Sequence, residues 1–177
     1  MTFQKILFEA LQPTGLLRHL KEFGSATHYA SLGGKEPDLS WRPSRVPRGR
    51  SSYWPSAVLE VADTESEPKL SSDIRFWKRA SRGDVKSVIT LRVDRAHPQI
   101  RIENWVNSEH NKERPHLRQS VTIHKDSKNR ITSNGPFVIS FEDLILREAQ
   151  TAQEKDISLD EDKLHYLAGE IWQEQGF

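Results

Sequence analysis

The stretch Trp54-Pro-Ser-Ala-Val-Leu-Glu-Val-Ala-Asp63 contains an apolar run, Ala57 to Ala62, that is interrupted by a single carboxylate at Glu60. A short apolar run of this kind is typical of a central β-strand that is buried on both faces. Burying an ionised carboxylate is costly unless a cation, a metal ion or a bound proton compensates its charge. Glu60 is therefore the first candidate functional residue of the chain.

The residues that follow this strand predict a strand–helix–strand unit. A helix is expected at about 67–82, with Ser66 as its N-cap and Gly83 as its C-terminal stop. Its apolar stripe consists of Leu70, Ile74 and Trp77. The next strand, Val85 to Val93, should lie beside and parallel to the Glu60 strand, as such crossover units nearly always arrange their strands.

The remaining patterns extend this unit into a larger mixed sheet with helices. Further strands are expected at Gln99–Trp105, Leu117–His124 and Phe137–Phe141. Helices are expected as two short segments within 3–22, at 142–150, and from a capping box at Ser158-Leu159-Asp160-Glu161 to Gly176. The fold class predicted is α/β, a mixed β-sheet core flanked by helices in a single domain, 1–177.

Composition excludes several classes of function. The chain has 177 residues, a mean hydropathy of −0.70 and no cysteine, which excludes disulfides, thiolate nucleophiles and zinc sites that contain cysteine. The segment Phe3 to Leu11 carries Lys5 and Glu9 and does not resemble a signal peptide, and no run reaches the length of a membrane helix. We expect an intracellular protein, cytoplasmic or nuclear.

Charge is distributed unevenly along the sequence. Between Lys35 and Arg101 there are 14 Lys/Arg against 9 Asp/Glu, whereas from Phe141 onward there are 3 against 10. The run Arg42 to Ser52 reads as an exposed, mobile arginine-rich loop. Its arginines are candidates to contact nucleic-acid phosphates without reading sequence, namely Arg42, Arg45, Arg48 and Arg50.

Polar residues that could carry chemistry gather around Glu60. Asp38 begins a short extended segment and would lie beside Glu60 if the two strands pair. Lys69 and Asp73 are one helical turn apart and could form an ordinary i,i+4 pair on a solvated face. Two carboxylates and a lysine at adjacent strands form a site for a hard divalent cation that assists phosphodiester cleavage. The alternative is that the Glu60 side chain sits at a sheet edge or pairs with one of the nearby arginines.

The segments Trp54–Trp77 and Val85–Val93 resemble a group of small, mostly fungal proteins. These in turn are similar to a bacterial family of nuclease-like proteins with a Pro-Asp pair followed by a Val-Val-Glu-Val strand. Both belong to the restriction-endonuclease-like PD-(D/E)xK superfamily. The resemblance implies that Asp38 is the first acid and Glu60 the acid of the Glu-x-Lys element. Ala62 stands where that lysine is expected, which makes Lys69 the first substitute and Lys78 the second.

Two functions follow from these residues. The first is a nuclease dependent on Mg²⁺ or Mn²⁺, with Asp38 and Glu60 as metal ligands and Lys69 assisting the attacking water. The second, favoured by Ala62, is a catalytically inactive module of the same fold that binds nucleic acid or a protein partner. Trp41 and Trp54 are candidates to stack on bases or to line a protein contact. Nucleic acid and a second copy of the chain, in a homodimer, are the partners considered, and a membrane is not.

Overall fold

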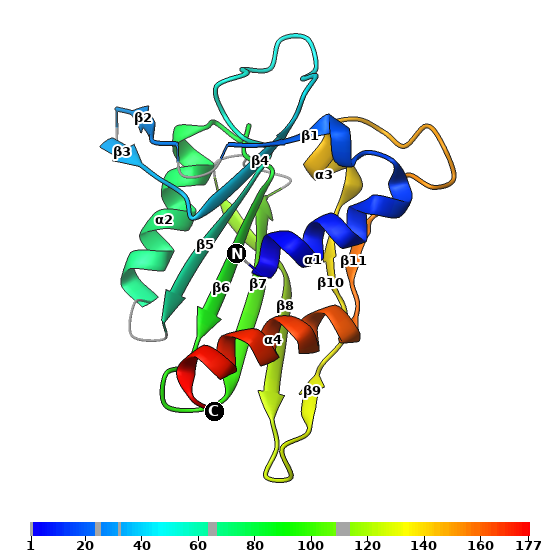
Figure 1. The fold of residues 1–177 in the computed structure, drawn as a ribbon. Coiled ribbons are helices and arrows are strands. Elements are labelled where there is room, and N and C mark those ends of the chain that lie inside the picture. Colours follow the sequence, from blue (N-terminus) through cyan, green and yellow to red (C-terminus); the bar gives the residue numbers. More distant parts are fainter. Residues whose placement is uncertain (1, 24–25, 32, 64–66, 109–113) are drawn as a thin grey trace.

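The computed structural model describes residues 2–23, 26–31, 33–63, 67–108 and 114–177, and its ribbon is shown in Figure 1. The elements in chain order are α1 (Thr2–Leu11), the 3₁₀ turns η1 (Gln12–Thr14) and η2 (Leu17–His19), β1 (Leu20–Glu22), β2 (His28–Ala30), β3 (Gly33–Lys35), β4 (Leu39–Pro43), β5 (Ala57–Asp63), α2 (Glu67–Ala80), β6 (Ser87–Val93), β7 (Gln99–Asn107), β8 (Pro115–Lys125), β9 (Ile131–Ser133), β10 (Phe137–Ile139), α3 (Phe141–Ile145), β11 (Ile157–Leu159) and α4 (Glu161–Gln175). None of the helices formed by the described residues is long and apolar enough to cross a membrane.

The main sheet has the strand order β1-β4-β5-β6-β7-β8-β9. Strands β5 and β6 are parallel, with Glu60 opposite Thr90, and the other neighbours in this sheet pair antiparallel. The parallel pair predicted from the Glu60 strand and the Val85–Val93 segment is confirmed. The predicted fold class is also confirmed, because the chain is an α/β protein whose mixed sheet is flanked by helices.

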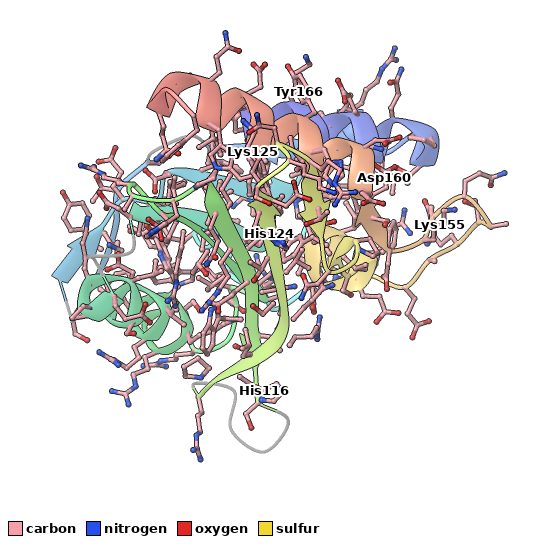
Figure 2. The ribbon with its side chains drawn as sticks, turned by 90° about the horizontal axis from the view of Figure 1, so that it is seen from below. His116, His124, Lys125, Lys155, Asp160 and Tyr166 are labelled. Atoms are coloured by element: carbon pink, nitrogen blue, oxygen red, sulfur yellow. The ribbon has the colours of Figure 1, made fainter. Side chains whose placement is uncertain are left out.

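The two faces of the sheet are covered by different helices. Helices α1 and α4 pack on one face and α2 packs on the other, an arrangement visible in Figure 1 and again from below in Figure 2. Residues alternate between these faces along β5, as the pleat requires. Leu59 joins the larger core under α1 and α4, whereas Val58 joins the smaller core under α2. Glu60 is two residues after Val58, so its side chain points to the same face of the sheet, toward α2.

Two predicted helices are shorter than expected. The expected helix after Gly15 is instead one 3₁₀ turn followed by β1, whose Leu20 pairs with Pro43 at the edge of the main sheet. Tertiary pairing here overrides a local helical pattern of apolar residues. The helix expected at 142–150 ends at Ile145, because Leu146 adopts a left-handed conformation with φ of 64° and donates its N–H to the carbonyl of Glu142.

The cap of the last helix differs from the prediction. Ser158 lies in β11, where it pairs with Val138, and is not available as a cap. Asp160, labelled in Figure 2, accepts a hydrogen bond from the backbone N–H of Lys163 instead. Gly176 ends the helix in the left-handed conformation, as predicted. The proposed N-cap of α2, Ser66, lies outside the described residues.

Arg50 is a structural residue of the β4–β5 connection. Its side chain is 7% exposed, and it donates hydrogen bonds to the backbone carbonyls of Ser51, Trp54, Pro55 and Asp84. Its guanidinium therefore holds the loop onto the turn that precedes β6. Donors used in this way are not available for a phosphate, in contrast to the role expected from the sequence.

We expect Arg50→Leu to lower the free energy of unfolding by about 2–4 kcal/mol, because it leaves buried carbonyls without a donor. Urea unfolding followed by tryptophan fluorescence measures this loss. Arg48→Leu is the matched control, since Arg48 lies exposed in the same loop. Equal stability of the two variants would contradict the structural role of Arg50.

Candidate functional site

The strand pair β4–β5 brings Asp38 to Glu60. Leu39 pairs with Leu59, so Asp38 stands opposite Glu60 at the next position of the ladder. The Oδ2 atom of Asp38 accepts a hydrogen bond of 2.7 Å from the backbone N–H of Val61, and its own N–H donates to the carbonyl of Leu59 at 3.1 Å. The Asp38 carboxylate is thus fixed against the backbone of β5 beside Glu60. It is exposed to solvent, whereas Glu60 is buried.

The environment of Glu60 favours its protonated form. Its side chain is 5% exposed, and its Oε1 accepts a hydrogen bond of 2.5 Å from the indole N–H of Trp77 on α2. Burial raises the pKa of Glu60 to about 7. The Trp77 bond and the charge of Lys35 oppose this rise, while the carboxylates of Asp73 and Asp38 add to it. Glu60 therefore changes its charge near neutral pH.

The lysine of this cluster is Lys35, which sequence reasoning missed. Lys35 lies at the end of β3, and its Nζ forms an ion pair of 2.6 Å with Asp73 on α2. Lys69 is exposed on α2 and does not pair with Asp73, so the expected i,i+4 pair is wrong. The available signal was the position of Lys35 three residues before Asp38, at the end of a segment with a glycine pair typical of a hairpin.

Lys78 serves a different part of the structure. It is completely buried, and its Nζ donates to the carbonyls of Val85 and Lys86 at 3.1 and 2.8 Å. Burial lowers the pKa of Lys78 to about 7. Its bonds tie the end of α2 to the segment that leads into β6. Lys78 is therefore a structural residue, and Lys35 is the lysine whose charge acts on Glu60.

A second buried glutamate on the same face of the sheet, Glu103, has an arginine partner, which Glu60 lacks among the described residues. Glu60 is opposite Thr90 on β6, and Thr90 is opposite Glu103 on β7. Glu103 is 5% exposed and forms an ion pair of 3.1 Å with Arg92. Among the described residues, Glu60 has no ion-pair partner of its own and relies on a neutral indole. The negative charge of Glu103 is thus balanced by a bound arginine. The carboxylate of Glu60 has only a hydrogen bond from a neutral indole.

The donor set at Asp38 and Glu60 suits a hard divalent cation. Each carboxylate has one oxygen without a hydrogen bond among the residues the structure describes. The same residues contain no group of three or more His, Asp or Glu side chains arranged to hold a metal. Mg²⁺ commonly takes one or two carboxylates and completes its shell with water and substrate phosphate oxygens. Two carboxylates from neighbouring strands therefore fit this ion.

The arginines predicted to bind phosphate differ in availability. Arg42 lies on β4 with its guanidinium 4.5 Å from the ring centre of Phe23, and Arg50 is bonded to carbonyls. Arg45 and Arg48 are exposed. Their loop leaves the sheet at the end of β4, whereas Asp38 precedes its beginning, and the five residues between span about 16 Å. Only Arg45 and Arg48 are free to meet a phosphate, at some distance from Glu60.

The tryptophans expected to stack on bases are occupied within the protein. Trp41 is fully buried and packs 6.3 Å from Phe3 in the larger core. Trp54 is 8% exposed and stacks on His28 at 5.4 Å. Neither presents a free ring face to solvent, so the predicted base stacking by Trp41 and Trp54 is wrong. His28 and Trp54 both contact Trp77 edge-on and so support the residue that bonds Glu60.

No family model matches the chain, and no curated protein matches it. Among solved structures, that of a "putative nuclease belonging to DUF820" from Anabaena variabilis ATCC 29413 superimposes on 92% of this chain and 76% of its own length. The TM-score is 0.43 and the sequence identity is 12%.

We expect Glu60→Gln to remove a pH-dependent loss of stability. The folded chain holds the Glu60 proton up to a pKa of about 7, whereas the unfolded chain releases it near 4.5. Stability from this group is therefore fully present below pH 4.5 and is lost as pH rises through 7. The variant should match the wild type at pH 4 and exceed it by about 3 kcal/mol at pH 9.

Urea unfolding at pH 4, 6 and 9 measures this difference. Glu148→Gln, at an exposed position with the same charge change, is the control and should leave the pH profile unchanged. A constant difference between Glu60→Gln and wild type across this range would show that Glu60 titrates normally in the folded chain.

Proposed function

We propose that this chain is a divalent-metal-dependent nuclease of the PD-(D/E)xK type. The observation that carries the proposal is the buried Glu60 carboxylate beside Asp38, with Lys35 supplying the nearby positive charge. Asp38 and Glu60 are the metal ligands, and Lys35 takes the role that the superfamily gives to the lysine absent at Ala62. Mg²⁺ or Mn²⁺ is the proposed cofactor.

Each residue of the cluster has its own role in the proposed phosphodiester hydrolysis. A bound divalent cation would lower the pKa of water and polarise the phosphate. Asp38 and Glu60 hold negative oxygen ligands at adjacent strands, and deprotonation of Glu60 above pH 7 prepares it to accept a cation. The ammonium group of Lys35 orients the attacking water or stabilises negative charge that develops on the phosphate. Asp73 holds Lys35 in place.

A second candidate is a module without catalytic activity that binds nucleic acid or a protein. Two contacts within the protein favour this module. Glu60 accepts a hydrogen bond from Trp77, and Lys35 forms an ion pair with Asp73. In such a module these contacts would join α2 and the β2–β3 hairpin to the sheet. The two candidates predict different responses to a metal ion.

We expect cleavage of nucleic acid in the presence of Mg²⁺ or Mn²⁺ and none in EDTA. Glu60→Gln and Asp38→Asn should abolish it, because each removes a negative metal ligand. Lys35→Met should lower kcat by about 100-fold, the usual loss when a group that stabilises transition-state charge is removed. Gel analysis of single-stranded and duplex DNA and of RNA measures these rates.

Lys69→Met is the matched control for Lys35→Met and should stay within about twofold of wild type, since Lys69 is exposed. Binding of Mn²⁺ followed by calorimetry should weaken in Asp38→Asn and Glu60→Gln. A folded wild-type chain that binds no metal and cleaves none of these polymers would reject the nuclease and favour the binding module.

A further inference from the structure

The outer side of α2 borders a basic cavity that the proposed catalytic residues do not line. This cavity has a volume of about 680 Å³. Its lining consists of Ser71, Ile74, Arg75, Arg79, Trp105, Arg114 and Pro115. Among the residues the structure describes, its lining has three arginines and no acidic residue. The indole N–H of Trp105 is buried without a hydrogen-bond acceptor among the same residues.

A second cavity continues from the first across Arg79. Its volume is about 520 Å³, and it is lined by Tyr29, Ala30, Ser31, Tyr53, Trp54, Arg79, Ala80 and Arg82. Tyr29 is 71% exposed and Tyr53 is 47% exposed, so both rings present area to solvent. No acidic side chain lines this cavity in the part of the chain that the structure describes. Arg79 belongs to both walls and makes the two cavities one continuous surface, which we call the α2 ridge.

The positive charges of the α2 ridge are uncompensated. Arg75, Arg79, Arg82 and Arg114 are exposed, and none has a side-chain ion pair or hydrogen bond among the described residues. Elsewhere arginines such as Arg92 and Arg147 are paired with carboxylates. Two of these guanidinium groups are on α2, one follows its end and one precedes β8. Unpaired positive charges that line neighbouring cavities attract a polyanion.

Arg82 lies at the C-terminal end of α2, beside the second cavity. Arg82 has a φ of 51°, in the left-handed region that side chains other than glycine avoid. Gly83 follows with a φ of 84°. This conformation ends the helix, because the N–H of Arg82 donates to the carbonyl of Arg79 and the N–H of Gly83 donates to the carbonyl of Lys78. It leaves the Arg82 side chain at the wall of the second cavity.

We propose that the α2 ridge binds single-stranded nucleic acid. The inference rests on the proposed nuclease function for the identity of the polymer and adds where that polymer lies. Arg75, Arg79 and Arg114 contact backbone phosphates, and Tyr29 and Tyr53 stack on bases. Exposed aromatic rings beside a basic groove bind unpaired bases, whereas the bases of a duplex already stack on each other.

The α2 ridge also connects to the proposed catalytic cluster. Trp54 lines the second cavity and contacts Trp77 edge-on at 6.3 Å, and Trp77 bonds Glu60. Two indoles, those of Trp54 and Trp77, therefore connect the wall of the second cavity to the buried carboxylate. Helix α4 covers the opposite face of the sheet (Figure 2), and it carries four acidic residues against one lysine.

Fluorescence anisotropy with a labelled 20-nucleotide strand in EDTA tests the α2 ridge without cleavage. The probe is used as DNA, as RNA and as the corresponding DNA duplex, with wild-type protein at 50 and 200 mM salt. We expect single strands to bind at least tenfold more tightly than the duplex. Arg75→Gln/Arg79→Gln/Arg114→Gln should weaken this binding and reduce the slope of log K against log salt by about 2, since each lost phosphate contact removes about 0.7.

Variants of single residues separate function from folding. Tyr29→Ala should weaken single-strand binding about fivefold or more with an unchanged salt slope, while Tyr29→Phe should keep wild-type affinity because the ring remains. Arg82→Gly should weaken binding without loss of stability, because glycine adopts this φ freely. Arg18→Gln/Lys155→Gln removes two exposed charges outside the α2 ridge and should change affinity by less than twofold.

Equal affinity for duplex and single strand, or an equal loss per charge in the Arg18/Lys155 variant, would overturn the inference. So would unchanged binding by the triple arginine variant. Failure of the nuclease proposal is a separate result, namely binding with these properties and no metal-dependent cleavage. Cleavage that persists with an unchanged KM in the arginine variants would reject the α2 ridge and leave the nuclease intact.

Discussion

The structure is organised around the cost of burying one carboxylate under α2. Glu60 sits in the middle of the strand that joins the antiparallel and parallel parts of the sheet, where water does not reach it. Two elements offset that cost: α2 through Trp77 and the β2–β3 hairpin through Lys35. Asp38 on β4 adds to it, because a second carboxylate beside Glu60 disfavours its charged form. An apolar residue at position 60 would need none of these polar contacts.

Periodicity along the chain predicted the centre of the fold better than its edges. The apolar run at Ala57–Ala62 and the helix with Leu70, Ile74 and Trp77 are dictated by burial on both sides, which is written directly into residue type. The segment after Gly15 was misassigned because a three-residue edge strand needs a partner, Pro43, that no local pattern reveals. The cap at Asp160 was missed for a similar reason, since β11 withdraws Ser158 from the helix end.

The residues of the candidate site were also predictable only in part. Asp38 and Glu60 could be found from the sequence, because a carboxylate in an apolar strand and a Pro-Asp pair at the start of another are local signals, and their meeting required only that the two strands pair. The lysine could not be found, because its position depends on where a hairpin 25 residues upstream of Glu60 lies in space. Arg50 and Trp41 show the converse error: residue types suited to binding nucleic acid are used inside the protein to satisfy carbonyls and to fill the core.

The lysine and the carboxylates belong to different cooperative units. Strands β2 and β3 form a two-stranded sheet of their own, and such a hairpin has little stability in isolation. Its packing is close, since a Cβ at Gly34 would approach the ring of Tyr29 to 2.7 Å, and a hydrogen bond from the Tyr29 N–H to the Tyr53 hydroxyl adds a tether. Local opening of this hairpin would carry Lys35 away while the seven-stranded sheet stayed folded. The charge next to Glu60 can thus be gained or lost by a motion much smaller than unfolding, so amide protons of β2 and β3 would exchange with solvent sooner than those of β5.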